Sequence, residues 1–296
     1  MTTSTENVKD RGELVVVTGA STGMGAATAR ELAGRGYHVL AGVRRQIDGE
    51  ALRAPRVEPV ILDITTDADV EAIANRVARD PEGRPLRALV NNAGIAINAP
   101  VETLPMSQWH AQFDVNFFGH IAMTQALLPA LLDSSGTVVN ISSVGGRVAL
   151  ATYGAYAGSK FALEAVSDAL RRELEGSGVH VVVVEPGAVV TDMADRGIAK
   201  ADALAAAMTP GQRDRYAALV GAVTAQARTF TRDGVPAERA AQIIADAATA
   251  KNPRTRYTIG RDAAVLVRLA RVLPDRTLDK VARRALKPHY PAPAAR

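Results

Sequence analysis

Residues 14–25, Leu-Val-Val-Val-Thr-Gly-Ala-Ser-Thr-Gly-Met-Gly, decide the fold class of this chain. The apolar, β-branched run 14–18 is typical of a buried strand in a parallel sheet. It leads directly into Gly19, Gly23 and Gly25, and a helical pattern covers 26–35. Such a strand, glycine-rich turn and helix N-terminus make a phosphate site, because glycines let the backbone approach closely and free N–H groups attract anions. The spacing G-x-x-x-G-x-G differs from the commoner G-x-G-x-x-G dinucleotide motif, so this stretch alone is also compatible with a plain tight turn.

The rest of the chain repeats an alternation of apolar strands and amphipathic helices. We predict strands at 37–42, 57–62, 86–91, 137–141, 179–184 and 255–259, and helices at 67–79, 108–132, 152–174 and 236–248. This alternation predicts an α/β fold: a Rossmann-like, doubly wound parallel sheet of about seven strands in a three-layer αβα arrangement. The ligand crevice of such a sheet lies at the carboxyl ends of its strands. Residues of chemical interest follow those ends, namely Gly19, Arg44, Asp63, Asn92 to Gly94, Ser142 and Ser143, and Pro186 and Gly187.

The composition is that of an ordinary globular protein, with 296 residues of which 47% are hydrophobic and 22% charged. The absence of cysteine excludes disulfides and thiolate metal sites and is compatible with the cytoplasm. The five histidines show no metal-ligand spacing, so no metal is expected. No apolar run reaches membrane-spanning length, and the first twelve residues lack an apolar signal core. A soluble, cytoplasmic protein is therefore expected.

Basic residues are concentrated at the C-terminus. Residues 251–296 hold 12 Lys/Arg against 3 Asp/Glu, although the whole chain carries a net charge of only +4. A basic segment can contact nucleic acid, acidic lipid or a partner subunit. No nucleic-acid-binding motif accompanies it, so no nucleic-acid partner is expected.

The C-terminal segment has a helical pattern over 262–287 that is broken at Pro274, with an apolar stripe of Val265, Leu266, Leu269 and Val272. Packing against the core or a second subunit is the favoured use, and an amphipathic membrane-surface helix is the alternative. We expect three regions: a disordered N-terminus (1–12), an α/β domain (13–260) with a substrate-loop region (188–235), and a basic helical extension (261–296).

Tyr156 and Lys160 lie four residues apart, so a helix would project both from one face. A free phenol titrates near pH 10, and a neighbouring ammonium stabilises the phenolate and lowers that pKa. A hydroxyl from Ser143, or from the adjacent Ser142, would complete an acid/base site around a substrate oxygen. Tyr153 has no such cation partner, because Ala157 follows it at the same spacing. Alone, a Tyr-x-x-x-Lys pair is also compatible with a solvated helix face.

Together, these motifs resemble the single-domain type of the short-chain dehydrogenase/reductase family. The matching motifs are Thr18 to Gly25, Asp63-Ile64, Asn91-Asn92-Ala93-Gly94, Asn116, Ser143, Tyr156-x-x-x-Lys160 and Pro186-Gly187-x-x-x-Thr191. They follow the order of the family over residues 14 to 195. The family commonly forms homodimers or homotetramers through the helices that contain Asn116 and Tyr156, and we expect the same here.

The resemblance implies four catalytic residues. Tyr156 would be the general acid, or the base in the reverse reaction, and Lys160 would lower its pKa and bind the nicotinamide ribose. Ser143 would hold the substrate oxygen; it is preferred to Ser142 because its offset from Tyr156 fits the family better. Asn116 would hold a water that links Lys160 to solvent, although an ordinary helix-kink hydrogen bond is the alternative.

The resemblance also implies a nicotinamide dinucleotide site. Asp63 would bond the adenine amino group, Asn91 the adenosine ribose region, and Thr191 the carboxamide or pyrophosphate. The predicted cofactor-binding residues are Gly19, Ser21, Thr22, Gly23, Met24, Gly25, Arg44, Asp63, Ile64, Asn92, Ala93, Gly94, Tyr156, Lys160, Pro186, Gly187, Val189 and Thr191.

The end of the predicted strand 37–42 favours NADP(H) over NAD(H). Sites that select NAD place a carboxylate there, to accept hydrogen bonds from the ribose 2′-hydroxyl. Here two arginines, Arg44 and Arg45, follow the strand with no acid before them. A guanidinium suits a 2′-phosphate through its charge and its fork of donors, and Ser21 could add a hydroxyl contact. Arg44 is the preferred contact, and Arg45 would stack or remain solvated.

We therefore expect an NADP(H)-dependent oxidoreductase that interconverts a ketone or aldehyde with an alcohol. Few charges in 144–153 and the apolar bias of 188–230 favour a hydrophobic small-molecule substrate, with steroid, retinoid-like and xenobiotic carbonyls all open. One alternative is a non-catalytic NADP(H)-binding regulator or scaffold. Another, a sugar-nucleotide isomerase or dehydratase, fits poorly because the glycine spacing and the short C-terminal region disagree.

Overall fold

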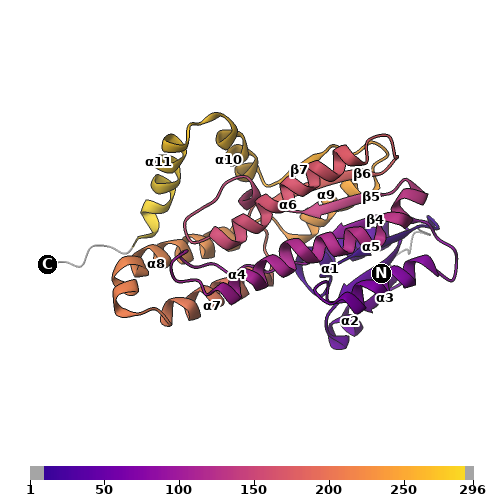
Figure 1. The fold of residues 1–296 in the computed structure, drawn as a ribbon, viewed down its shortest axis with the longest axis horizontal. Helices are drawn as coiled ribbons and strands as arrows, with labels where there is room; N and C mark the ends of the chain where they lie inside the picture. Colours follow the sequence, from indigo (N-terminus) through magenta and orange to yellow (C-terminus); the bar gives the residue numbers. More distant parts are fainter. Residues whose placement is uncertain (1–9, 291–296) are drawn as a thin grey trace, which may run out of the picture.

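The computed structural model describes residues 10–290 (Figure 1). Its strands are β1 (Leu14–Val17), β2 (His38–Val43), β3 (Val57–Ile61), β4 (Leu86–Asn91), β5 (Thr137–Ile141), β6 (His180–Pro186) and β7 (Arg256–Ile259). Its helices are α1 (Gly23–Gly34), α2 (Gln46–Leu52), α3 (Asp67–Ala78), α4 (Met106–Phe113), α5 (Gly119–Ser134), α6 (Gly154–Glu173), α7 (Asp192–Ala206), α8 (Pro210–Arg232), α9 (Ala237–Thr249), α10 (Arg261–Val272) and α11 (Asp275–Leu286).

Within residues 10–290, seven parallel strands form one sheet in the order β3-β2-β1-β4-β5-β6-β7. The chain moves from β1 outward to β3, and then returns to β4 on the other side of β1. The strand order therefore reverses between β1 and β4, where a doubly wound sheet opens its ligand crevice. The predicted fold class, a Rossmann-like doubly wound parallel sheet, is confirmed.

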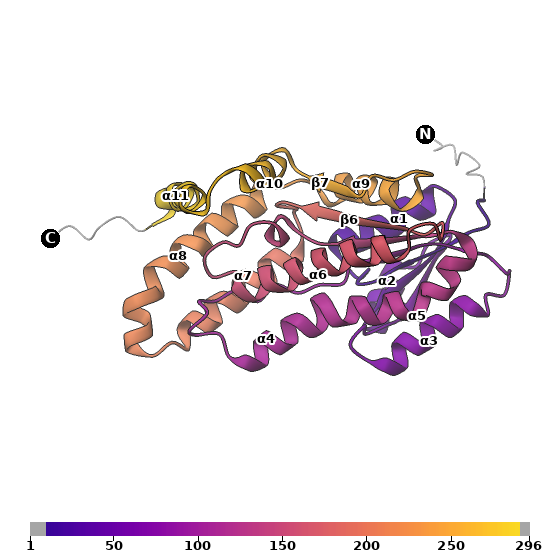
Figure 2. The ribbon, with the colours of Figure 1, turned by 45° about the horizontal axis from the view of Figure 1, so that its top comes forward.

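Helices cover both faces of this sheet (Figure 2). Val15 and Val17 of β1 belong to the core under α1 and α9, whereas Leu14 and Val16 belong to the core under α3, α5 and α6. Alternate side chains of a strand point to opposite faces, and all four of these residues are fully buried. An apolar run without polar alternation is what a strand covered on both faces requires.

The predicted strands agree with the structure to within two residues at each end. The bounds of β4 and β5 are as predicted, whereas β2 begins and ends one residue later than 37–42. The largest difference is in β6, which continues to Pro186 rather than ending at residue 184. Pairing of Pro186 with Ile259 of β7 extends this strand, and that pairing cannot be predicted from β6 alone.

The predicted helix 108–132 contains an irregular turn. Residues Asp114–Phe118, between α4 and α5, form a π-helical turn. Asn116 lies in this turn and is bound to the backbone of Ile95: Oδ1 accepts from the amide at 2.9 Å, and Nδ2 donates to the carbonyl at 2.9 Å. Single π-helical turns inside α-helices are frequent at functional sites.

The same helical stretch, Met106–Ser134, is the one helix within residues 10–290 that is long and apolar enough to span a membrane. It has 29 residues and a mean hydropathy of 1.3 over its most apolar window, and the sequence analysis did not single it out. In this fold, Met123, Leu127 and Leu131 of α5 are buried against the sheet, which is the ordinary use of an apolar helix in an α/β core.

The segment predicted as the substrate region folds into α7 and α8, beyond the carboxyl ends of the strands (Figure 1). The C-terminal helical pattern breaks where it was predicted, because α10 ends at Val272 and α11 begins after Pro274. The domain bounds stay predictions. Most of the predicted disordered N-terminus, residues 1–9, lies outside the described residues.

A buried polar chain joins β4, β5 and α6 below the crevice. Asn91 Nδ2 donates to Asn140 Oδ1 at 2.9 Å, and Asn140 Nδ2 donates to Ser167 Oγ at 2.8 Å. Unpartnered buried polar groups cost about 1 to 3 kcal/mol each. This chain of hydrogen bonds therefore holds α6 against β4 and β5.

We predict that Asn140→Ala lowers the free energy of unfolding by about 2 to 4 kcal/mol, because it leaves buried hydrogen-bonding groups without partners. Urea unfolding followed by circular dichroism measures the change. Asn75→Ala, on the exposed side of α3, is the matched control and should change stability by less than about 0.5 kcal/mol. Equal effects of the two substitutions would contradict this role of Asn140.

Candidate active site

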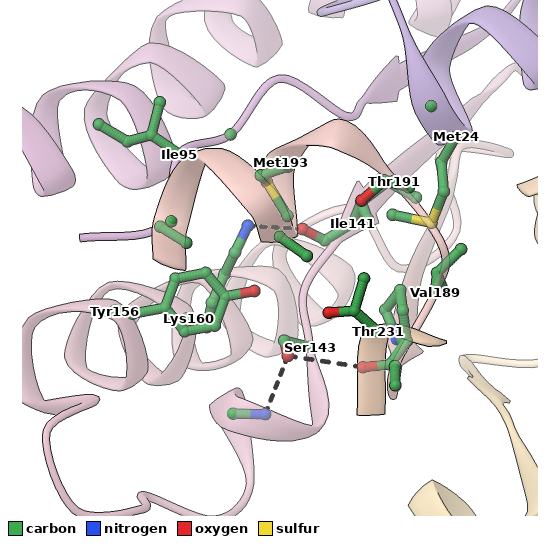
Figure 3. A pocket seen from close by; sticks show the side chains of 18 of the residues that line it. Met24, Ile95, Ile141, Ser143, Tyr156, Lys160, Val189, Thr191, Met193 and Thr231 are labelled. Carbon is green, nitrogen blue, oxygen red and sulfur yellow. Dashed lines mark hydrogen bonds between the residues drawn. The ribbon is translucent and has the colours of Figure 1, made fainter. Parts of the chain in front are cut away.

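A cavity of 780 Å³ opens at the carboxyl ends of the strands (Figure 3). Apart from Asn91, the predicted catalytic and cofactor-binding residues line it, from the glycine turn after β1 to Thr191 after β6. Residues of α7, α8 and the start of α10 complete its wall. Its volume is within the range of about 300 to 1,000 Å³ that is usual for small-molecule and cofactor sites.

The turn between β1 and α1 requires glycine. Gly19 has a φ of +63° and Gly23 a φ of +57°, in the left-handed region that other residues avoid. A Cβ on Gly19 would lie 2.6 Å from the Cα of Ala93. A Cβ on Gly25 would lie 2.5 Å from Asn92 Nδ2 and would also collide with the Gly19 carbonyl. The turn and the end of β4 therefore pack backbone against backbone.

This turn presents the N-terminus of α1 to the cavity as an anion site. Thr22 is the N-cap residue, but its side chain accepts no capping hydrogen bond, and the first turn of α1 holds no acid. The N–H groups of that turn are the donors that a pyrophosphate binds at a helix N-terminus. The glycine turn and uncapped helix therefore fit a dinucleotide.

The two arginines after β2 differ in their surroundings. Arg45 is tied to Asp48, with Nε donating to Oδ2 at 2.8 Å and Nη2 donating to Oδ1 at 2.6 Å. Arg44 lines the cavity and, within residues 10–290, forms neither an ion pair nor a side-chain hydrogen bond. A guanidinium with five unused donors at the edge of a cavity is suited to a phosphate. The geometry therefore favours Arg44 over Arg45.

The side chains of Asn91 and Asn92, at the end of β4, have different surroundings. Asn92 lines the cavity, and its Nδ2 donates to the carbonyls of Thr18 at 2.9 Å and Gly19 at 3.1 Å. Asn91 is fully buried and donates to Thr124 and Asn140. The predicted contact of Asn91 with the adenosine ribose is therefore wrong, because its amide is bonded inside the core.

Asp63 lies at the cavity edge after β3. Its Oδ1 accepts hydrogen bonds from the amide of Thr65 at 3.0 Å and from the hydroxyl of Thr65 at 2.7 Å. These bonds fix the carboxylate beside Ile64, which also lines the cavity. An adenine amino group could donate to a carboxylate held in this way.

Ser143, Tyr156 and Lys160 point into one part of the cavity (Figure 3). Tyr156 and Lys160 come from α6, and Ser143 follows β5. Lys160 Nζ donates to the carbonyl of Ile141 at 2.8 Å, and Ser143 Oγ accepts from the amide of Gly145 at 3.0 Å. Ser142 also lines the cavity, but it packs beside Gly146 and Glu164.

Burial governs the protonation of this group. The pKa of Lys160 falls from 10.5 to about 8, because burial disfavours the ammonium, although the negative charge of Glu164 opposes the shift. Burial also raises the pKa of Tyr156 above 10, and the Ser143 hydroxyl partly offsets this effect. The lowering of the Tyr156 pKa by Lys160 that the sequence predicts is not found in this arrangement. A neutral phenol at physiological pH is a proton donor.

Asn116 connects the π-helical turn to α6. Besides its bonds to Ile95, its Nδ2 lies 3.3 Å from Ser159 Oγ, and Ser159 Oγ donates to the carbonyl of Tyr156 at 2.7 Å. Asn116 is fully buried. Of its two predicted uses, the structural hydrogen bonds are present, and the water-holding role stays a prediction.

His120 is a buried residue that the sequence analysis did not place at the site. Its Nε2 lies 2.7 Å from the carbonyl of Ala93, in the turn that lines the cavity after β4. Burial and the charge of Lys160 lower the His120 pKa to about 3, so the imidazole is neutral. Since a carbonyl only accepts, Nε2 carries the proton, and His120 holds this turn in place.

A partly buried ionic cluster behind α6 was also missed. Arg256 of β7 donates from Nη2 to Glu164 Oε2 at 3.0 Å and to Asp168 Oδ1 at 2.8 Å, and its Nε lies 3.4 Å from Glu185. Burial and the charge of Glu185 raise the Glu164 pKa. The sequence held one signal of this cluster: Glu164 follows Lys160 by four residues, so the two side chains share one helix face.

Much of the cavity lining is apolar. It includes Val148, Leu150, Met193, Ile198, Phe230 and Leu266. The buried Oδ1 of Asn98 has no hydrogen-bond partner within the described part of the chain. Tyr153 packs edge-on against Tyr156, with ring centroids 6.3 Å apart. This lining suits an apolar molecule that carries few polar groups.

Comparison with known proteins gives consistent matches over most of the chain. The family model described as short chain dehydrogenase matches residues 13–202. An uncharacterized oxidoreductase, YbbO, of Escherichia coli K12 is 34% identical over 268 residues, covering 90% of this chain and 93% of that protein. Retinol dehydrogenase 5 of Mus musculus is 37% identical over 276 residues, covering 90% and 86%.

Two further matches concern the cofactor. The NADPH-dependent 3-dehydrocapnine reductase of Ornithobacterium rhinotracheale is 31% identical over 280 residues, covering 92% of this chain and 96% of that protein. A solved structure of a short chain dehydrogenase from Burkholderia cenocepacia J2315 in complex with NADP superposes with a TM-score of 0.70 at 26% identity. It covers 93% of this chain and 97% of the other.

Because the pKa of Lys160 is lowered in the folded protein, the free energy of unfolding depends on pH. Between about 8 and 10.5 the unfolded chain binds more protons at this residue than the folded chain, so the wild type gains stability as pH rises through this window. Lys160→Met removes the dependence. We predict that the wild type becomes more stable relative to Lys160→Met as pH rises across this window. The free energy of unfolding of Lys160→Met minus that of wild type should decrease by a few kcal/mol, at about 1.4 kcal/mol per pKa unit.

Denaturant titrations across that pH range measure this difference. Lys200→Met, which changes an exposed lysine of α7, is the control and should show no comparable pH dependence. A Lys160→Met difference that stays constant or increases with pH would contradict the burial-lowered pKa.

Proposed function

This chain belongs to the short-chain dehydrogenase family of oxidoreductases, and we propose that it is an NADP(H)-dependent reductase of hydrophobic ketones or aldehydes. The reaction is reversible, so the same site would oxidise the corresponding alcohol. The observation that carries the proposal is the convergence of Ser143, Tyr156 and Lys160 in one cavity with an uncapped helix N-terminus. An intact acid/base group is not expected in a non-catalytic regulator.

The proton chemistry belongs to Tyr156. A bound reduced nicotinamide would supply the hydride to the carbonyl carbon. The Tyr156 hydroxyl would donate its proton to the carbonyl oxygen, and the neutral phenol that burial favours is the form this step needs. The Ser143 hydroxyl would donate a hydrogen bond to the same oxygen and so polarise the carbonyl.

Lys160 would stabilise the phenolate that remains after proton transfer. It is buried, so its charge acts in a medium of low dielectric and is screened little by water. Its ammonium already donates to the Ile141 carbonyl, which fixes the direction of the side chain toward the cavity. Asn116 in the π-helical turn and His120 would hold in place the part of the cavity wall formed by Ile95 and Ala93.

The preference for NADP(H) over NAD(H) is part of the proposal. It is supported by Arg44 at the cavity edge, which forms no ion pair within residues 10–290, and by the engagement of Arg45 with Asp48. The names of the O. rhinotracheale reductase and the B. cenocepacia structure, which mention NADPH and NADP, support it further. The B. cenocepacia protein shares only 26% of the sequence, so Arg44 is the stronger argument.

An apolar substrate is supported by the carbon-rich wall made by α7, α8 and the loop before α6. Retinol dehydrogenase 5 is named for an apolar alcohol, which agrees with this expectation.

We also propose a cytoplasmic homo-oligomer. Phe118, just before α5, is 56% exposed, and Phe161 of α6 is 44% exposed. A second copy of the chain could cover these apolar side chains.

We predict that Tyr156→Phe lowers kcat for ketone reduction by at least about 100-fold, because the proton donor is lost. The dissociation constant of NADPH should stay within a few-fold, since the ring remains. Steady-state kinetics and fluorescence titration measure the two quantities. Tyr153→Phe, which removes the same hydroxyl from the neighbouring ring, should act mainly on KM. Normal turnover by Tyr156→Phe would exclude the proposed mechanism.

We predict that Arg44→Ala weakens NADPH binding roughly 10- to 100-fold, the value of a charge-assisted hydrogen bond, and leaves NADH binding unchanged. Arg45→Ala is the matched control and should weaken NADPH binding by less than about threefold, because Arg45 is engaged by Asp48. Binding titrations with both cofactors give the answer. The reverse ranking of the two variants would assign the 2′-phosphate to Arg45.

A further inference from the structure

The C-terminal helices carry many basic side chains that have no acidic partner. Residues 261–287 contain eight Lys/Arg, and all of them are exposed: Arg261, Arg268, Arg271, Arg276, Lys280, Arg283, Arg284 and Lys287. Within residues 10–290, none of the eight forms a salt bridge. Arginines elsewhere in the chain, such as Arg35, Arg76 and Arg256, are paired with carboxylates. The positive charge of α10 and α11 is therefore available to a partner.

On α10, arginine and valine alternate along one exposed face. Arg261, Val265, Arg268 and Val272 are spaced so that they share a single helix face. Val265 is 54% exposed and Val272 is 75% exposed. The opposite face of α10 is anchored in the fold by Ala263 and Val267, which are buried.

On α11, the basic residues lie opposite the side that contacts the protein. Arg276, Lys280 and Arg283 share one face by their spacing, Lys287 follows the end of the helix, and no residue of α11 is buried. Gln226 of α8 donates to the carbonyl of Ala285 at 3.2 Å, which ties α11 to the body of the protein. In Figure 2, α10 and α11 lie at the same end of the molecule, beside α8.

This basic surface adjoins the cavity. Arg261, Ala263 and Leu266 of α10 line it, and so does Phe230 at the end of α8, which is 50% exposed. A molecule that enters at this end would pass exposed apolar side chains surrounded by arginines. The same combination of apolar and basic side chains is typical of protein surfaces that rest on a lipid interface.

We propose that α10 and α11 form a docking surface for an anionic lipid bilayer, which the protein binds reversibly. The arginines and lysines contact the phosphate headgroups, and Val265 and Val272 enter the boundary between headgroups and acyl chains. Docking does not depend on the proposed reductase activity. The consequence of docking does rest on the proposed reductase activity: an apolar ketone dissolved in the bilayer would be delivered near the cavity.

Charge and composition favour lipid over the other occupants of such a surface. A second copy docked through the same face would bring two basic surfaces together, which is repulsive. A nucleic acid backbone would use the arginines but would gain little from the valines between them. An anionic bilayer satisfies both kinds of side chain, and each basic residue near it increases binding by about fivefold.

Co-sedimentation of the full-length protein with vesicles tests this proposal. Vesicles of phosphatidylcholine with phosphatidylglycerol are compared with vesicles of phosphatidylcholine alone, with and without NADPH. We expect binding only to the anionic vesicles and weaker binding at higher salt. The double variant Arg268→Gln/Arg271→Gln should lower the partition coefficient about 25-fold, from two losses of about fivefold each.

The matched control is Arg53→Gln/Arg79→Gln, which removes the same charge from two exposed arginines outside α10 and α11. It should change vesicle binding less than about twofold. Neither Arg268 nor Arg271 lines the cavity, so reduction of a water-soluble ketone by Arg268→Gln/Arg271→Gln should equal that of wild type. Vesicle binding is measured without turnover, so failure of the reductase proposal would not affect this result.

Four results would overturn the proposal. Equal binding to neutral and anionic vesicles would exclude a role for charge. Equal losses in the two double variants would exclude α10 as the contact. Displacement of the protein from vesicles by an oligonucleotide that binds more tightly, or a change of oligomeric state in Arg268→Gln/Arg271→Gln without vesicle binding by wild type, would assign the surface to nucleic acid or to a second copy.

Discussion

The site depends on the close approach of the backbone after β1 to the backbone after β4. Thr18 Oγ1 accepts hydrogen bonds from the amides of Asn92 and Ala93, both at 3.0 Å. Asn92 returns two hydrogen bonds to the carbonyls of Thr18 and Gly19. Because no Cβ fits at Gly19 or Gly25, this contact requires glycine. It brings the N-terminus of α1 and the polar ends of the central strands to one edge of the sheet.

Burial is the second constraint, and it acts oppositely on the two titrating residues of α6. The same dry surroundings raise the pKa of Tyr156 and lower that of Lys160 to about 8, so burial opposes the charged form of each residue. Neighbouring groups moderate the effect on each residue, Ser143 for the phenol and Glu164 for the ammonium. The site is therefore electrostatically costly to the folded chain, and this is common where structure serves chemistry rather than stability.

Much of the fold and the site could be predicted from the sequence, because periodicity and strand ends are local properties. The pattern places Gly19, Arg44, Asp63, Ser143 and Pro186 at strand ends, and all of them line one cavity. Features that depend on tertiary contacts were missed or wrong. The π-helical turn depends on the bonds between Asn116 and Ile95, and the role of Asn91 depends on which side of β4 it faces. The Arg256 cluster joins residues more than 80 positions apart, which no local pattern shows.

In the proposed reaction, this cavity transfers hydride between a nicotinamide with a 2′-phosphate and a hydrophobic carbonyl. The most direct test is the consumption of NADPH and of NADH by the purified protein with a panel of apolar ketones and aldehydes. NADPH should be consumed with at least one of these substrates, and NADH should be consumed far more slowly. Tight binding of NADPH without turnover of any carbonyl compound would contradict the proposed reaction and would favour a non-catalytic cofactor-binding role.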